Sequence, residues 1–194
     1  MFNSLLHVGT IMEKLEKPRE LIVKSLKCWA MFEKLVADLY ELVAKKTSDE
    51  ALSLSLRWIS TESRSHFTYL ENLSTMVGGV KEYNCAEFIG IPWLTNESLL
   101  RDVNGVEQVD VNMALNILRK LQKTEKLASE EVYSTILSNL LKDLTSLIDI
   151  NEELLRAVLE EISMEEKYHS KIVELLIDYL SKALEANNYQ NCNK

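Results

Sequence analysis

The chain has 194 residues, of which 46% are hydrophobic, so it is long enough to bury one sizeable core. Its formal net charge of −8 argues against nucleic-acid or membrane partners, because both attract a basic surface. Only five glycines and two prolines are present. Helix breakers are therefore scarce, and the composition predicts an all-α fold in a single domain, residues 1–194.

The sequence gives no sign of membrane insertion, export or cysteine chemistry. No apolar run reaches the roughly 18 residues of a membrane-spanning helix, and the N-terminal segment lacks the features of a secretory signal. We therefore expect an intracellular, cytoplasmic protein. Cys28, Cys85 and Cys192 are isolated, without a C-x-x-C pair, so we expect free thiols and neither a disulfide framework nor a cysteine-based metal site.

Two helices are predicted in the first 77 residues. Pro18 indicates a helix start after an N-terminal extension of residues 1–17, and apolar residues recur every three or four positions to about residue 46. Ser48, followed by acidic residues, predicts the N-cap of a second helix. This helix is expected to run to about residue 77, where Gly78 and Gly79 end it.

The second half of the chain begins with a segment that has no sustained period, residues 78–110, and this segment predicts a long crossover with one short helix. A third helix is predicted from about residue 111 to 148, with a possible break near Ser129. Asn151, followed by two glutamates, predicts the N-cap of a last helix. We expect that helix to end near residue 186, before a frayed polar tail of residues 187–194.

The second and last helices resemble each other when the chain is shifted by 103 residues. The shift aligns Glu62 with Glu165 and His66 with His169. Amphipathic helices match easily in leucine and glutamate, so the aligned histidines, from a total of three, are the informative pair.

Polar residues interrupt the apolar stripe of each predicted helix near its middle. Glu166 and His169 do so on the last helix, Ser63 and His66 on the second, and Glu33 on the first. On the third helix the best stripe contains Glu130, with Glu131 adjacent and Glu125 on a second possible stripe.

A buried carboxylate is costly unless it is paired or bound to a metal, so these interruptions suggest a shared partner. Their heights along the helices test this idea. Glu33 precedes Thr47 by 14 residues and Glu62 follows it by 15, so both should lie level across the first hairpin. In the second hairpin, Glu130 or Glu131 would lie roughly 8 to 9 Å off the level of Glu166.

These motifs resemble the ferritin-like superfamily, and within it the rubrerythrin-like proteins. The resemblance is carried by "FEKLVADLYELVAKK", which contains Glu33 and Tyr40, and by "ISMEEKYHSKIVELL", which contains Glu166 and His169. It implies an antiparallel four-helix bundle of two helical hairpins joined by a long crossover, with carboxylates and histidines binding two metal ions. The implied ligands are Glu33, Glu62, His66, Glu130 or Glu131, Glu166 and His169.

The resemblance further implies two iron or manganese ions that react with O₂ or peroxide, as in an oxidase or peroxidase, in a homo-oligomer such as a dimer. No rubredoxin module is present, so the electron donor must lie elsewhere. Tyr40 could be a core residue or a hydrogen-bond donor to a ligand.

The sequence departs from the family at one ligand position. Ser63 stands where the last helix has Glu166, and the nearby carboxylate, Glu62, lies four residues before His66 rather than three. Two alternatives therefore stay open. The protein could be a metal-free bundle that acts as a scaffold or interaction protein, or an iron-storage protein. Iron and manganese are not distinguished by this ligand set.

Overall fold

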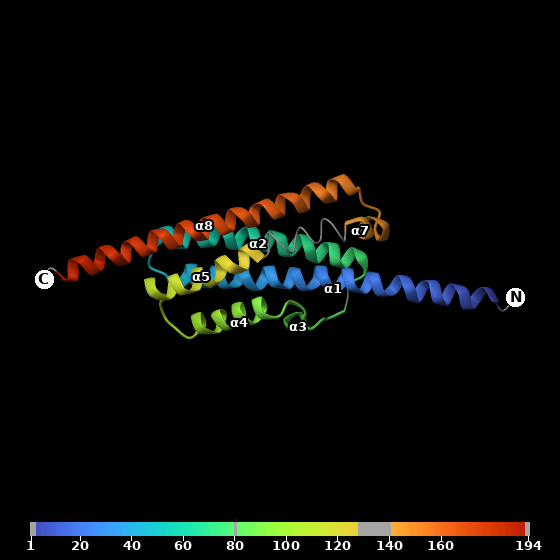
Figure 1. Ribbon diagram of the computed structural model, residues 1–194, viewed down its shortest axis with the longest axis horizontal. Helices are drawn as coiled ribbons and strands as arrows, with labels where there is room; N and C mark the ends of the chain where they lie inside the picture. Colours follow the sequence, from blue (N-terminus) through green and yellow to red (C-terminus); the bar gives the residue numbers. More distant parts are fainter. Residues whose placement is uncertain (1–2, 80, 128–140, 193–194) are drawn as a thin grey trace.

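The computed structural model describes residues 3–79, 81–127 and 141–192 and shows an all-helical protein (Figure 1). Its helices are α1 (Asn3–Lys46), α2 (Glu50–Val77), α3 (Cys85–Ile89), α4 (Ile91–Asn104), α5 (Val111–Leu127), α7 (Leu141–Leu147) and α8 (Glu152–Cys192). The described residues contain no strand, only an isolated bridge between Thr47 and Val109. The all-α prediction is confirmed for this part of the chain.

Helix α1 begins at Asn3, so the prediction that Pro18 starts the helix is wrong. Proline lacks an N–H and crowds the carbonyl four residues earlier, which is costly within a helix. The flanking leucine, methionine, glutamate and lysine residues are good helix formers. The helix therefore continues through the proline, and residues 3–17 belong to α1.

A short turn joins α1 and α2, which lie side by side (Figure 1). The carboxylate of Asp49 accepts a hydrogen bond from the Leu52 N–H at 2.8 Å, so the N-cap is Asp49 and not the predicted Ser48. Helix α2 ends at Val77 as predicted. Gly78 follows it with φ of 103° and donates its N–H to the Thr75 carbonyl at 3.0 Å, a left-handed conformation that favours glycine.

The crossover contains two helices, α3 and α4, where the sequence predicted one. Pro92 lies in the first turn of α4, where its missing N–H costs no helical hydrogen bond. The ammonium group of Lys46 donates to the carbonyls of Val103 at 2.9 Å and Val106 at 2.6 Å. This contact fixes the end of α4 to the end of α1.

The second half of the chain follows the predicted order of helices. The predicted third helix corresponds to α5 and α7, whereas the possible break near Ser129 lies outside the described residues. The side chain of Asn151 accepts a hydrogen bond from the Leu154 N–H at 2.9 Å and caps α8, as predicted. Helix α8 continues to Cys192 rather than ending near residue 186, because no glycine or proline interrupts it.

The buried apolar residues form two clusters along the helix axes. On α2, Ile59 belongs to one cluster and Leu70 to the other. On α8, Val173 belongs to the first cluster and Ile162 to the second. The polar interruptions identified on α2 and α8 therefore lie between two apolar layers. No helix in the described ranges is both long and apolar enough to cross a membrane.

Cys28 of α1 and Cys85 of α3 form a disulfide, so the prediction of free thiols is wrong for this pair. Their Cα atoms lie 4.9 Å apart although 57 positions separate them in the chain. No spacing along the chain indicated this pair, because the two residues meet only where the crossover returns onto α1. The bond attaches the crossover to the helix that carries Glu33.

Removal of this disulfide is expected to destabilise the protein. Replacement of both Cys28 and Cys85 by alanine should lower the free energy of unfolding by about 2–4 kcal/mol, because the bond restricts the unfolded chain. Urea denaturation monitored by circular dichroism measures this loss. The control Cys192→Ala should retain wild-type stability, and an equal loss in the control would contradict the prediction.

Candidate metal centre

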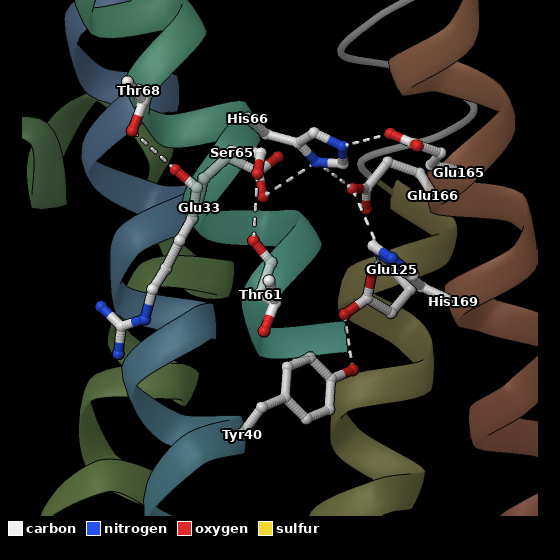
Figure 2. Close-up of polar contacts among 11 residues, drawn as sticks. Glu33, Tyr40, Thr61, Ser65, His66, Thr68, Glu125, Glu165, Glu166 and His169 are labelled. Atoms are coloured by element: carbon white, nitrogen blue, oxygen red, sulfur yellow. Dashed lines mark hydrogen bonds and ion pairs between the residues drawn. The ribbon is translucent and has the colours of Figure 1, made fainter. Parts of the chain in front are cut away.

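Five ionisable side chains from four helices are buried between the two apolar clusters. Figure 2 shows them converging on one region, with Glu33 from α1, His66 from α2, Glu125 from α5, and Glu166 and His169 from α8. Each is at most 6% exposed. Charged groups at this depth must be compensated by partners of opposite charge or by metal ions.

These five residues form two groups of three that share Glu166. Glu33, His66 and Glu166 make the first group, and Glu125, Glu166 and His169 make the second. Within each group, one potential ligand atom from every residue lies within 4.8 Å of the others. Each group could therefore hold a metal ion, and the shared carboxylate could bridge two ions.

The central contacts involve the Nδ1 atoms of both histidines and Oε1 of Glu166. This oxygen lies 2.8 Å from Nδ1 of His66 and 3.4 Å from Nδ1 of His169. Each histidine also approaches a second carboxylate, with Nδ1 3.8 Å from Glu33 Oε2 for His66 and 3.8 Å from Glu125 Oε2 for His169. The two imidazole rings lie 5.9 Å apart between centroids.

Some polar atoms of the buried cluster lack hydrogen bonds, and this observation bears on whether the cluster fits a metal ion. Glu166 Oε1 and His169 Nδ1 are buried and have no hydrogen-bond partner among the described residues. Their contacts are close, but the atoms are not aligned as donor and acceptor. Buried polar atoms almost always find a partner. Carboxylate oxygens and imidazole nitrogens are also ligands of iron and manganese, so the residues present fit such an ion.

A second set of contacts surrounds the ligand candidates. Nε2 of His66 lies 2.8 Å from Oε2 of Glu165, and the hydroxyl of Tyr40 donates to Oε1 of Glu125 at 2.5 Å. Both contacts are drawn in Figure 2. A carboxylate that binds the outer nitrogen of a histidine fixes its tautomer and leaves the inner nitrogen available as a ligand. The Tyr40 contact agrees with the alternative in which this residue orients a ligand.

In the metal-free cluster, protonated histidines compensate the negative charges of the buried carboxylates. Burial alone would lower the pKa of His66, but the neighbouring carboxylates of Glu166 and Glu33 outweigh burial and raise this pKa to about 11. The pKa of His169 is likewise raised to about 10, by Glu125 and Glu166 against the effect of burial. Both imidazoles are therefore cationic at neutral pH when no metal is bound.

The carboxylates at the centre respond differently to their surroundings. Burial, together with the charges of Glu33 and Glu125, raises the pKa of Glu166 to about 7. Burial also acts to raise the pKa of Glu125, but His169, together with hydrogen bonds from Glu166 and Tyr40, lowers it overall. Glu125 is thus an ionised partner of His169, whereas Glu166 exchanges its proton near neutral pH.

The structure brings together four of the predicted site residues, Glu33, His66, Glu166 and His169. Glu62 is half-buried on α2 and lies outside both groups. The predicted ligands Glu130 and Glu131 lie outside the described residues. Whether any of these side chains binds a metal stays a prediction.

Two contributors were not among the predicted ligands. Glu125 lay on the second possible stripe of the third helix, and spacing alone could not show which stripe faces inward. Glu165 was visible in the repeat as the counterpart of Glu62, about one helical turn before the histidine of its helix. Its contact with His66 depends on how α8 packs against α2, which the repeat does not specify.

Comparisons with models of known protein families, with curated proteins and with solved structures found no match to this chain. The functional argument therefore depends on the geometry of the site.

The stability of the metal-free protein should fall as the pH rises from about 7 to 10. An unfolded histidine releases its proton near pH 6.5, whereas folded His66 and His169 keep theirs to about pH 11 and 10. Between these values the folded state binds more protons than the unfolded state, so deprotonation favours unfolding. Melting temperatures of chelator-treated protein at several pH values measure the effect.

The variant His66→Gln/His169→Gln provides the control for this measurement. It lacks both titrating groups but retains the lysines and tyrosines that also titrate at high pH. Its melting temperature should depend less on pH over the same range. A wild-type protein whose melting temperature stays constant, or falls in parallel with that of the variant, would refute the assignment.

Proposed function

We propose that this protein is a ferritin-like four-helix bundle whose buried cluster binds two metal ions, iron or manganese, and reacts with O₂ or peroxide as an oxidase or peroxidase. The observation that carries the proposal is the sharing of Glu166 by two buried groups of potential ligands. A single ion or an ordinary ion pair would not require two such groups around one carboxylate.

The distribution of ligand candidates among the helices supports the ferritin-like part of the proposal. Bundles of this kind place one glutamate on each of two helices and a Glu-x-x-His motif on each of the other two. Here α1 and α5 contribute Glu33 and Glu125, and α8 contributes Glu166 and His169. Helix α2 contributes His66, with Ser63 at the position of the second motif glutamate.

The connections between these helices also agree with the proposal. A tight turn joins α1 to α2, and a long segment containing α3 and α4 leads to α5. Helix α1 packs against α2, and α5 packs against α8. In ferritin-like folds a long crossover likewise joins two helical hairpins.

The chain would hold the ions and control their surroundings. Bound iron or manganese would supply the redox chemistry toward O₂ or peroxide, with electrons returned by a separate donor. Glu165 would orient His66, and Tyr40 would orient Glu125 through its hydroxyl. The apolar clusters on both sides would exclude bulk water and thereby strengthen the electrostatic interactions within the site.

A second candidate function is a metal-free scaffold, and the protonated state of the cluster favours it. Cationic His66 and His169 can balance the buried carboxylates without any ion. Ser63 in place of a motif glutamate agrees with the loss of a metal centre. In this case the cluster would be a polar core whose replacement by apolar groups is neutral or stabilising.

Metal content separates these two functions. Protein that is stripped of metal and reloaded anaerobically with Fe(II) should retain about two ions per chain, as expected for a bridged pair, measured by elemental mass spectrometry after desalting. The variant Glu166→Gln/His169→Phe should retain none, because it lacks the shared ligand. Absence of retained metal in the wild type after loading with Fe(II) or with Mn(II), together with an unchanged or higher melting temperature in the variant, would favour the scaffold.

Replacement of Glu165 should weaken metal binding although this residue lies outside both groups of ligand candidates. Glu165→Ala removes the partner of His66 Nε2, and loss of such a contact typically lowers metal affinity by about 10- to 100-fold. Competition with a chromophoric chelator measures the affinity. Glu161→Ala, which removes an exposed carboxylate from the same helix, is the control. Equal affinities of the two variants would contradict a role of Glu165 in holding His66.

A further inference from the structure

Ser63 is a buried residue of α2 whose hydroxyl has no hydrogen-bond partner among the described residues. It is 1% exposed. Other buried serines of the same helix do find acceptors, since Ser60 donates to the Ala37 carbonyl at 2.9 Å and Ser74 to the Val23 carbonyl at 3.5 Å. An unsatisfied buried hydroxyl is costly. Ser63 therefore lacks the structural explanation that accounts for Ser60 and Ser74.

The position of Ser63 connects it with the candidate metal centre. It lies three residues before His66, so both side chains share one face of α2. In the internal repeat Ser63 aligns with Glu166, as His66 aligns with His169. Glu166 is the carboxylate shared by both groups of ligand candidates. In this alignment, α2 therefore has the short hydroxyl side chain of Ser63 where α8 has the shared carboxylate of Glu166.

The charge balance of the metal-loaded site would also favour binding of an additional anion. The two groups contain three carboxylates, from Glu33, Glu125 and Glu166, and histidines bind metals in their neutral form. Two divalent ions would therefore carry more positive charge than these three carboxylates compensate. Each ion would have ligands from only three residues, one of them shared, and would retain open coordination positions.

We propose that Ser63 forms part of a binding site for a small anion, such as formate, acetate or azide, which takes the place of the missing α2 carboxylate at the metal pair. The Ser63 hydroxyl donates a hydrogen bond to this anion. The inference rests on the proposed function, because the anion requires bound metal ions. A small carboxylate supplies the carboxylate group that a glutamate has and a serine lacks. It adds a negative charge at the metal pair and a hydrogen-bond acceptor for the Ser63 hydroxyl.

Titration with azide and with formate tests the proposal on cobalt(II)-loaded protein, whose visible absorption reports a change of ligands without any enzymatic turnover. Both anions should alter the spectrum of the wild type with a saturable dependence on concentration. Ser63→Ala should raise the dissociation constant of each anion about tenfold, because a hydrogen bond to a charged group is lost. Ser63→Thr retains a hydroxyl and should bind the anions like the wild type.

Two further variants sharpen the test. Ser63→Glu supplies a carboxylate from the protein, so it should bind two ions per chain and no longer respond to either anion. Ser60→Ala removes a buried hydroxyl one turn away that is already bonded to Ala37, and it should leave the anion affinity unchanged. Similar effects of Ser60→Ala and Ser63→Ala would refute a specific contact of Ser63.

The metal content of the same samples distinguishes the two proposals. Two ions per chain without any spectral response to anions, or with equal anion affinity in wild type and Ser63→Ala, would overturn the anion site and leave the proposed function intact. A wild-type protein that retains no metal would overturn both.

Discussion

Burial of carboxylates between two apolar layers is the constraint on which the rest of this structure depends. Glu33, Glu125 and Glu166 are removed from water at the level where the two hydrophobic clusters meet. An isolated carboxylate in such surroundings costs several kcal/mol, so cationic imidazoles or metal ions must lie within a few ångströms. One helical turn rises about 5.4 Å, and a shift of one turn by any of the four helices would separate these groups.

Several contacts outside the cluster maintain this register between the helices. Along the first hairpin, Ser60 of α2 donates to the Ala37 carbonyl of α1 at 2.9 Å, and Ser53 donates to the Ala44 carbonyl at 2.7 Å. At the other end of this hairpin, Arg19 Nε donates to the Val77 carbonyl at 2.8 Å. These bonds join side chains to carbonyls of the neighbouring helix, so they fix the height of Glu33 relative to His66.

The two halves of the site are related by the repeat, but they differ in their surroundings. His66 has the carboxylate of Glu165 at its outer nitrogen, 2.8 Å away. His169 instead has the ring of the half-exposed Trp58 nearly perpendicular to its own, with 5.6 Å between centroids, and its Nε2 has no hydrogen-bond partner among the described residues. The difference between Ser63 and Glu166 adds to this asymmetry. Helices α2 and α8 therefore differ at the positions that surround the ligand candidates.

The sequence by itself determined the all-α class, the turn at Gly78, the cap at Asn151 and the polar interruptions that contain Glu33, His66, Glu166 and His169, because helix periodicity, capping and burial cost are local properties of the chain. The tertiary structure decided that Glu125 faces inward on α5 and thus its place in the cluster. It also decided the pairing of Cys28 with Cys85 and the contact of Glu165 with His66. Each of these depends on how distant segments pack, and residue spacing along one helix carries no information about its neighbours.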